Sequence, residues 1–97
     1  MFKLFRTEKF IKKFNKLDNS IKIRFERQFK ILEINPFIGR PLKSRWFREL
    51  KVENYRIYYL IKEQKVSILL LDTSNKKGQQ EIINQIYPKL REYLELI

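Results

Sequence analysis

The sequence predicts an α+β fold with the element order β-α-α-β-β-β-α. Three observations support this prediction. Apolar residues recur every three or four positions between residues 7 and 34, three apolar runs separated by short polar breaks occupy residues 46–73, and a second helical pattern follows residue 80. With 97 residues, of which 43% are hydrophobic, the chain is long enough to form one small core. We therefore expect a single domain over residues 1–97.

The N-terminal third predicts a short strand followed by two antiparallel helices. The stretch FKLF at residues 2–5 is typical of a strand, and Thr7 can cap the helix that follows it. A turn at residues 17–20 should separate two helices with one apolar face each, formed by Phe10, Phe14 and Leu17 in the first and by Ile21, Phe25, Phe29 and Leu32 in the second. The second helix should end at Asn35, because a residue that precedes proline disfavours the helical region.

The middle of the chain predicts an antiparallel meander of three strands. Residues 35–45 hold two of the three prolines and one of the two glycines, which indicates a basic loop. Strands are expected at residues 46–52, 55–62 and 65–73, joined by short polar turns. In the second strand, alternation predicts one face formed by Tyr55, Ile57, Tyr59 and Ile61 and the other by Arg56, Tyr58 and Leu60.

The C-terminal segment predicts a helix after the polar residues 73–80. Its apolar positions are Ile82, Ile83, Ile86, Leu90, Tyr93, Leu94 and Ile97. Pro88 interrupts this pattern, so either the helix kinks there or a second helix begins with Pro88 in its first turn.

The charge of the chain favours an anionic partner. Lys and Arg number 22 against 11 Asp and Glu, which gives a net charge of +11. Residues 1–16 contain six basic and one acidic residue, and residues 40–56 contain six basic and two acidic residues. Such clusters suit a nucleic acid or an acidic protein, although a solvated basic surface is the simpler alternative.

The absence of histidine and cysteine excludes several kinds of site. No thiolate nucleophile, Cys-ligated zinc or histidine base can form, and Asp18 and Asp72 alone are too few for a two-metal nuclease. The sequence has no Gly-rich phosphate loop, so we expect neither a cofactor nor a metal. The charged N-terminus holds no apolar run fit for a signal peptide or a membrane span, and a cytoplasmic location with no membrane partner is expected.

Three stretches carry a resemblance to a known family. They are NPFIGRPLK, ELKVENYRIYYLI and VSILLLDTSNKK, and together they resemble the RelE/ParE superfamily of bacterial and archaeal toxins over nearly the whole chain. The end DTSNKKGQQEIINQI is also similar to the HigB-like branch. The resemblance implies a RelE-like fold, in which a small antiparallel sheet carries the N-terminal helical hairpin on one face and a concave basic surface on the other. Active members cleave mRNA in the ribosomal A site without a metal and are neutralised by an antitoxin that wraps the toxin.

The resemblance also implies the catalytic residues. By position, Arg56 matches the family arginine that follows a tyrosine in the third strand, and Lys76 or Lys77 matches a second basic residue after the last strand. The sequence departs from RelE at Phe47 and Glu49, where RelE has lysines. It also has no tyrosine near Ile82 where RelE has one, and no histidine of the kind that HigB-type members use.

RNA cleavage by its own 2′-hydroxyl requires charge stabilisation of the phosphorane. Arginine suits this task, because its planar fork donates two hydrogen bonds to phosphate oxygens. Tyr58 shares the predicted face of Arg56 and could stack a base, although packing in the core is the alternative for this residue. For Arg56, the alternative is an ion pair with Glu49 or Glu53. A rim that binds the RNA backbone is predicted from Arg40, Lys43, Arg45, Arg48 and Lys51.

These residues lead to a primary hypothesis and two alternatives. The first is a ribosome-dependent mRNA endonuclease with Arg56, Lys76 and Lys77 as catalytic residues. The alternatives are a non-catalytic ParE-like toxin that inhibits a topoisomerase and a degenerate toxin that binds only nucleic acid or antitoxin. The expected partners are the ribosome, mRNA and an acidic antitoxin with an amphipathic helix, which would complement the basic surface.

Overall fold

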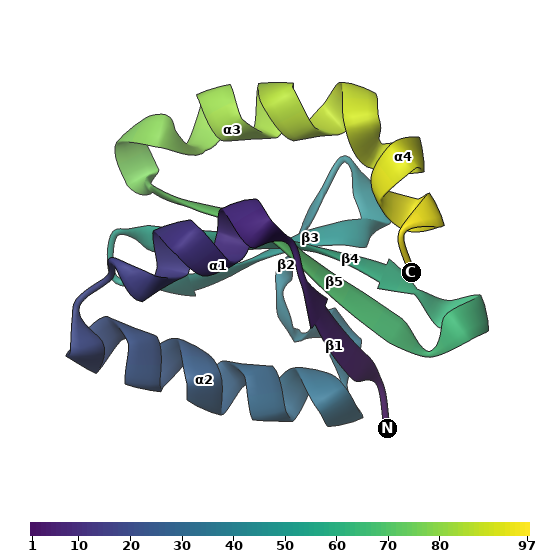
Figure 1. Ribbon diagram of the computed structural model, residues 1–97, viewed down its shortest axis with the longest axis horizontal. Coiled ribbons are helices and arrows are strands. Elements are labelled where there is room, and N and C mark those ends of the chain that lie inside the picture. The colour runs from purple at the N-terminus through teal and green to yellow at the C-terminus, as the bar shows by residue number, and fades with distance from the viewer.

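Five strands and four α-helices form three layers, with the sheet in the middle (Figure 1). The computed structural model describes residues 1–97. The strands lie in the order β1-β5-β4-β3-β2. Their bounds are β1 Lys3–Arg6, β2 Arg40–Leu42, β3 Ser44–Val52, β4 Tyr55–Lys62 and β5 Ser67–Asn75. The helices are α1 Glu8–Asn15, α2 Asn19–Ile34, α3 Gln79–Ile86 and α4 Leu90–Glu95. All four are too short or too polar to span a lipid bilayer.

The predicted α+β fold with its helical hairpin is confirmed. Thr7 caps α1 by accepting a hydrogen bond from the backbone N–H of Phe10 at 3.0 Å. Helix α2 ends at Ile34, directly before the Asn35–Pro36 pair. Pro88 lies in a 3-10 turn, Tyr87–Lys89, that separates α3 from α4. The proline therefore divides the C-terminal helical segment into two helices.

The sheet differs from the prediction at its two edges. Strand β1 runs parallel to β5, with Lys3 opposite Ser67, so the sheet is mixed and not wholly antiparallel. The segment 35–45, predicted as a loop, contains the short strand β2, which pairs with β3 through a tight turn at Lys43 with φ of 61°. Proline is tolerated in β2 because an edge strand has one side without ladder hydrogen bonds.

Each face of the sheet has its own core. Helices α1 and α2 pack on the first face, where their phenylalanines meet the side chains of Ile57, Tyr59 and Ile61. Helices α3 and α4 pack on the second face over Tyr58 and Leu60. The alternation predicted for β4 is therefore confirmed. The second face is not an open basic surface, because α3 and α4 cover part of it (Figure 1).

Candidate functional site

A surface hollow of about 520 Å³ lies where the turn between β3 and β4 meets the end of β5. Four polar residues line it: Asn54, Asn75, Lys76 and Lys77. Two backbone features bring these segments together. The backbone N–H of Lys76 donates to the carbonyl oxygen of Asn54 at 2.6 Å, and the Asn75 side chain accepts from the N–H of Gly78 at 2.9 Å. The sheet and its turns thus place two lysines in one concave site.

The hollow is cationic and its charges are free. Lys76 and Lys77 are exposed, and neither forms an ion pair with a carboxylate. Both lysines predicted at the end of the last strand therefore lie together in a site that an anion can enter. They are adjacent in a short 3-10 turn, Lys76–Gly78, that directly follows β5. The hydrogen bond from Lys76 to Asn54 fixes this turn against the turn between β3 and β4.

Arg56 lies at the same end of the sheet but does not line the hollow. It stands opposite Lys51 on β3 and Ser74 on β5, and only 6% of the residue is exposed. Its hydrogen bonds both come from Nη1, which donates to the carbonyl oxygens of Glu53 at 3.1 Å and Tyr55 at 3.2 Å, so Nε and Nη2 have no partner in the protein. The predicted floor of an open site is therefore largely covered. The alternative of an ion pair with Glu49 or Glu53 is also wrong, because no carboxylate lies within 4.0 Å of the guanidinium.

Glu49 is a buried carboxylate on the same face. It is 5% exposed and pairs in register with Tyr58. Its Oε1 accepts from Nε of Arg40 at 2.8 Å and pairs with Nη2 of Arg40 at 2.8 Å, while its Oε2 accepts from the side-chain amide of Gln79 at 2.7 Å. Arg40, predicted to bind RNA, therefore neutralises Glu49, although its side chain remains 67% exposed. Lys51 is exposed and has no ion pair.

Tyr58 cannot stack an RNA base in this structure, which corrects that prediction. The residue is 0% exposed, and its hydroxyl shares a hydrogen bond of 2.7 Å with Ser74. Burial raises the pKa of the Tyr58 hydroxyl above its ordinary value, because the charged phenolate would be poorly solvated there. The alternative of core packing is the correct one.

The predicted basic rim does not form one surface. Arg48 pairs in register with Tyr59, so it points to the face of α1 and α2. Its guanidinium donates to three backbone carbonyls, those of Gly39 at 2.8 Å, Arg45 at 2.8 Å and Phe37 at 3.1 Å. Arg48 therefore holds the segment before β3 in place and has few donors left for RNA, which corrects its prediction as an RNA-binding residue.

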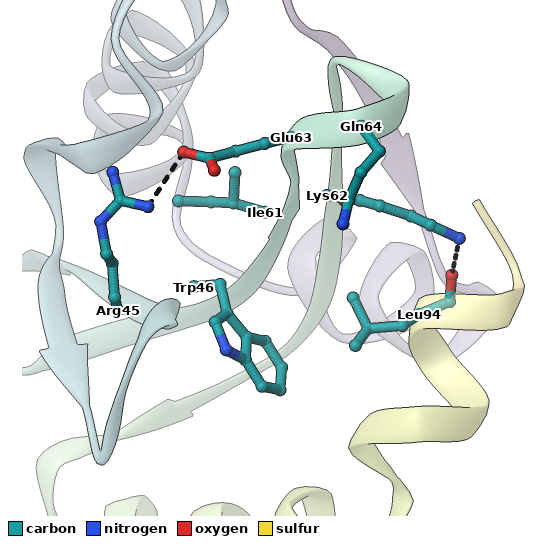
Figure 2. Close-up of a pocket in the computed structure, with 7 residues that line it drawn as sticks. All are labelled: Arg45, Trp46, Ile61, Lys62, Glu63, Gln64 and Leu94. Carbon is teal, nitrogen blue, oxygen red and sulfur yellow. Dashed lines mark hydrogen bonds and ion pairs between the residues drawn. The ribbon is translucent and has the colours of Figure 1, made fainter.

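Arg45 and Lys43 lie away from the hollow. Arg45 borders a second pocket of about 220 Å³ and pairs with Glu63 at 3.1 Å (Figure 2). Its guanidinium also lies over the Phe37 ring, 4.3 Å from the ring centre. The same pocket contains Lys62, whose Nζ donates to the carbonyl oxygen of Leu94 at 2.7 Å (Figure 2). Lys43 stands over the ring of Tyr87 at 4.8 Å. Because Lys62 ends β4 and Tyr55 begins it, this pocket lies at the other end of the strand from the hollow.

Sequence reasoning missed Asn54, Asn75 and Gln79 as site residues. Asn54 and Asn75 lie at the ends of predicted strands, where polar residues usually indicate turns. Gln79 begins α3 with no motif to distinguish it. The pairing of Asn75 with Tyr55 and the hydrogen bond from Lys76 to Asn54 bring the two turns together, and neither contact can be read from the sequence.

Comparisons with known proteins agree with this fold. The family model for the ParE toxin of the parDE type II toxin–antitoxin system matches residues 3–77, more than half of the chain. Comparison with curated proteins gives no match. The solved structure of the isolated E. coli RelE toxin superimposes with a TM-score of 0.71 and 16% identity, covering 89% of this chain and 99% of that one.

Two further structures are toxin–antitoxin complexes. The RelBE2 complex of Mycobacterium tuberculosis gives a TM-score of 0.65 with 20% identity, covering 76% of this chain and 96% of that chain. The archaeal RelE–RelB complex of Pyrococcus horikoshii OT3 gives a TM-score of 0.60 with 16% identity, covering 76% of this chain and 93% of that chain. At such identities, the structural likeness establishes the fold.

Proposed function

The chain belongs to the ParE toxin family of type II toxin–antitoxin systems, within the RelE/ParE superfamily, and from this premise we propose that it arrests translation by cutting mRNA on the ribosome. The observation that carries the proposal is the hollow with its two unpaired lysines. An RNA phosphate in the hollow would meet two ammonium groups at once. Because Arg56 lies at the same end of the sheet, its positive charge would add to theirs.

The proposed reaction is an internal transesterification. The 2′-hydroxyl of one nucleotide gives its proton to water as its oxygen attacks the adjacent phosphorus. The bond from phosphorus to the 5′-oxygen breaks, and the products carry a 2′,3′-cyclic phosphate and a 5′-hydroxyl. Lys76 and Lys77 would stabilise the phosphorane, and one of their ammonium groups would protonate the leaving 5′-oxygen. The free Nε and Nη2 donors of Arg56 suit a phosphate oxygen that reaches them.

A second candidate is a non-catalytic toxin that inhibits a topoisomerase. The family description favours it, since the matching model is that of ParE. The buried hydroxyl of Tyr58 and the carboxylate of Glu49 also favour it, because both remove groups that an RNA-cleaving site could use on this face. In this case, the hollow would bind a partner and perform no chemistry.

An acidic antitoxin is the proposed protein partner. Solved neighbours of this fold include complexes of RelE-type toxins with their antitoxins. On this chain, Ile31 of α2 is 50% exposed and Ile38 is 40% exposed, and both border a groove of about 460 Å³ that also includes Arg40 and Lys51. Apolar side chains beside the unpaired Lys51 and the exposed, Glu49-bound Arg40 suit an acidic amphipathic helix.

Controlled expression followed by mapping of transcript ends tests the proposal. We expect translation to stop with cut transcripts, and purified protein to cut mRNA on programmed ribosomes, which would place its action in the cytoplasm. The Arg56→Ala variant should lose roughly tenfold to a thousandfold in cleavage, as when one charge-stabilising donor is removed. Lys65→Ala is the matched control, because Lys65 is exposed in a 3-10 turn at the far end of β4.

The outcomes separate the two candidates. Cleavage by Arg56→Ala at the wild-type rate would remove the role assigned to the arginine. Intact transcripts together with filamentation and DNA damage would favour the topoisomerase inhibitor.

A further inference from the structure

The turn between β3 and β4 has a glutamate at a position that favours glycine. Two residues, Glu53 and Asn54, join the register partners Val52 and Tyr55. Glu53 has a positive φ of 52°, whereas Asn54 does not have a positive φ. Hairpin loops of two residues with a positive φ at the first position usually have glycine there, because glycine adopts this conformation without steric cost. Contacts with the rest of the fold must therefore hold Glu53 in place.

Arg56 makes the strongest of these contacts. Its Nη1 donates to the carbonyl oxygens of Glu53 at 3.1 Å and Tyr55 at 3.2 Å, and the residue is only 6% exposed. Hydrogen bonds from a charged donor are roughly twice as strong as neutral ones. The Glu53 carboxylate also pairs with Arg24 of α2, but these two side chains are 63% and 49% exposed, and ion pairs in water contribute little. Arg56 is therefore the main support of the turn.

The turn forms one wall of the hollow. Asn54 lines the hollow, and its carbonyl oxygen accepts from the backbone N–H of Lys76 at 2.6 Å. Lys76 and Lys77 belong to the 3-10 turn on the other side of this hydrogen bond. A turn that moved away from β5 would break the bond and change the position of both lysines relative to Asn54. The guanidinium of Arg56 is thus connected to the lysines through the backbone of two turns.

We propose that Arg56 is a positioning residue for the hollow. By fixing the carbonyl oxygen of Glu53 it holds the turn, and through Asn54 and Lys76 it holds the two ammonium groups where an RNA phosphate meets them. This role uses Nη1, whereas the phosphate oxygen proposed above would meet Nε and Nη2. The inference rests on the proposed function, in which the hollow binds RNA, and it adds a second way in which Arg56 serves that site.

The substitution Glu53→Gly separates the two roles of Arg56. Glycine adopts a φ of 52° without support, so the turn should keep its shape when Arg56 is replaced. The test variants are Arg56→Ala and the double variant Arg56→Ala/Glu53→Gly. The matched control is Arg56→Ala/Val66→Gly, because Val66 has a φ of 48° in the turn before β5, at the far end of β4. Val66→Gly relieves the same backbone strain away from the hollow.

Two measurements on the purified full chain test the inference without requiring cleavage. Hydrogen exchange of the Lys76 backbone amide, followed by NMR, reports the hydrogen bond to Asn54. Fluorescence anisotropy at fixed salt reports the affinity for a short 2′-O-methyl RNA oligonucleotide, which the proposed reaction cannot cut. Denaturation followed by Trp46 fluorescence shows which variants fold. If Arg56→Ala does not fold, Arg56→Met takes its place in every variant, because methionine fills irregular space in a core and has no donor.

We expect Arg56→Ala to raise the exchange rate of the Lys76 amide and to weaken oligonucleotide binding, each by about tenfold, as for the loss of a hydrogen bond from a charged donor. Arg56→Ala/Glu53→Gly should exchange at the wild-type rate and regain about threefold in affinity, with the rest lost because the charge of Arg56 is still missing. Arg56→Ala/Val66→Gly should behave as Arg56→Ala.

Three outcomes would overturn the inference. The first is an exchange rate of the Lys76 amide that is equal in wild type and Arg56→Ala. The second is restored exchange in Arg56→Ala/Glu53→Gly with no gain in affinity, because Arg56 would then act through its charge alone. The third is an equal recovery in Arg56→Ala/Val66→Gly, which would show a general gain in stability.

Failure of this inference and failure of the nuclease proposal are distinguishable. If Glu53→Gly restores exchange and affinity in the Arg56→Ala background while ribosomal transcripts stay intact, the positioning role stands and the nuclease proposal fails. If wild-type protein cuts transcripts but exchange of the Lys76 amide does not depend on Arg56, the nuclease proposal stands and Arg56 does not position the hollow.

Discussion

Replacing Tyr59 with phenylalanine should destabilise the fold strongly, although only one oxygen is lost. The Tyr59 hydroxyl donates to the carbonyl oxygen of Pro36 at 2.7 Å and accepts from the backbone N–H of Gly39 at 3.0 Å. All three residues are buried, and a Cβ on Gly39 would stand only 2.6 Å from that hydroxyl oxygen. A water molecule therefore has little room to take the place of the lost hydroxyl. The hydroxyl joins the segment before β2 to the centre of the sheet.

The expected loss follows from the two groups left unpaired. A buried donor or acceptor without a partner costs about 1–3 kcal/mol, so we expect Tyr59→Phe to lower the free energy of unfolding by about 2–4 kcal/mol. For a domain of this size, that corresponds to a fall of roughly 10–25 °C in the melting temperature.

Chemical denaturation followed by the fluorescence of Trp46 measures this loss. Tyr87→Phe is the control, because Tyr87 is 42% exposed and its hydroxyl has no hydrogen-bond partner in the protein. Its stability should stay within about 0.5 kcal/mol of wild type. If Tyr59→Phe unfolds at the same denaturant concentration as Tyr87→Phe, the two hydrogen bonds do not support the fold as described.

Three further predictions concern pH, a buried ion pair and salt. Burial raises the pKa of Tyr58 and Tyr59 above 10.0, so the folded chain keeps protons that the unfolded chain releases. Stability that is intact below about pH 10 should therefore fall as the pH rises further. Denaturation at stepped pH measures this, and a free energy of unfolding that stays constant above about pH 10 would contradict it. Asp72→Asn should lower the free energy of unfolding by about 1–3 kcal/mol, because Asp72 is 2% exposed and its carboxylate pairs with Nζ of Lys13 on α1 at 2.6 Å. A melting temperature equal to that of wild type, measured by calorimetry, would argue against a stabilising role for this ion pair. Replacing Lys76 and Lys77 with alanine should weaken single-stranded RNA binding and reduce the slope of log affinity against log salt by about 1.4, whereas an unchanged slope would place the RNA elsewhere.

Apart from the short strand β2, the order of the elements could be predicted from the sequence because the signals are local. The helical spacing of Phe10 and Phe14, the threonine cap and the Asn35–Pro36 stop each depend on residues within a few positions of one another. The two faces of β4 follow in the same way from alternation. The position of Lys76 and Lys77 directly after the last strand could also be read along the chain, and both line one hollow, while their catalytic role stays a prediction.

The exposure of each charged side chain depended on long-range packing instead. Arg48 and Arg56 are both arginines in strands, but Arg48 binds backbone carbonyls on one face and Arg56 is covered on the other. Their faces follow from the hairpin register, which places Arg48 opposite Tyr59.

The sequence by itself determined the secondary structure apart from strand β2, the cationic character of the chain and the lack of histidine or cysteine chemistry. The tertiary structure alone decided that β1 joins β5 in parallel and that Gln79 reaches Glu49, a residue 30 positions away, over the strand of Arg56. Local periodicity depends on neighbouring residues, so it can be read along the chain. Whether a charge meets solvent depends on which distant segment packs over it, and that is settled only when the layers of the fold bury their apolar faces against one another.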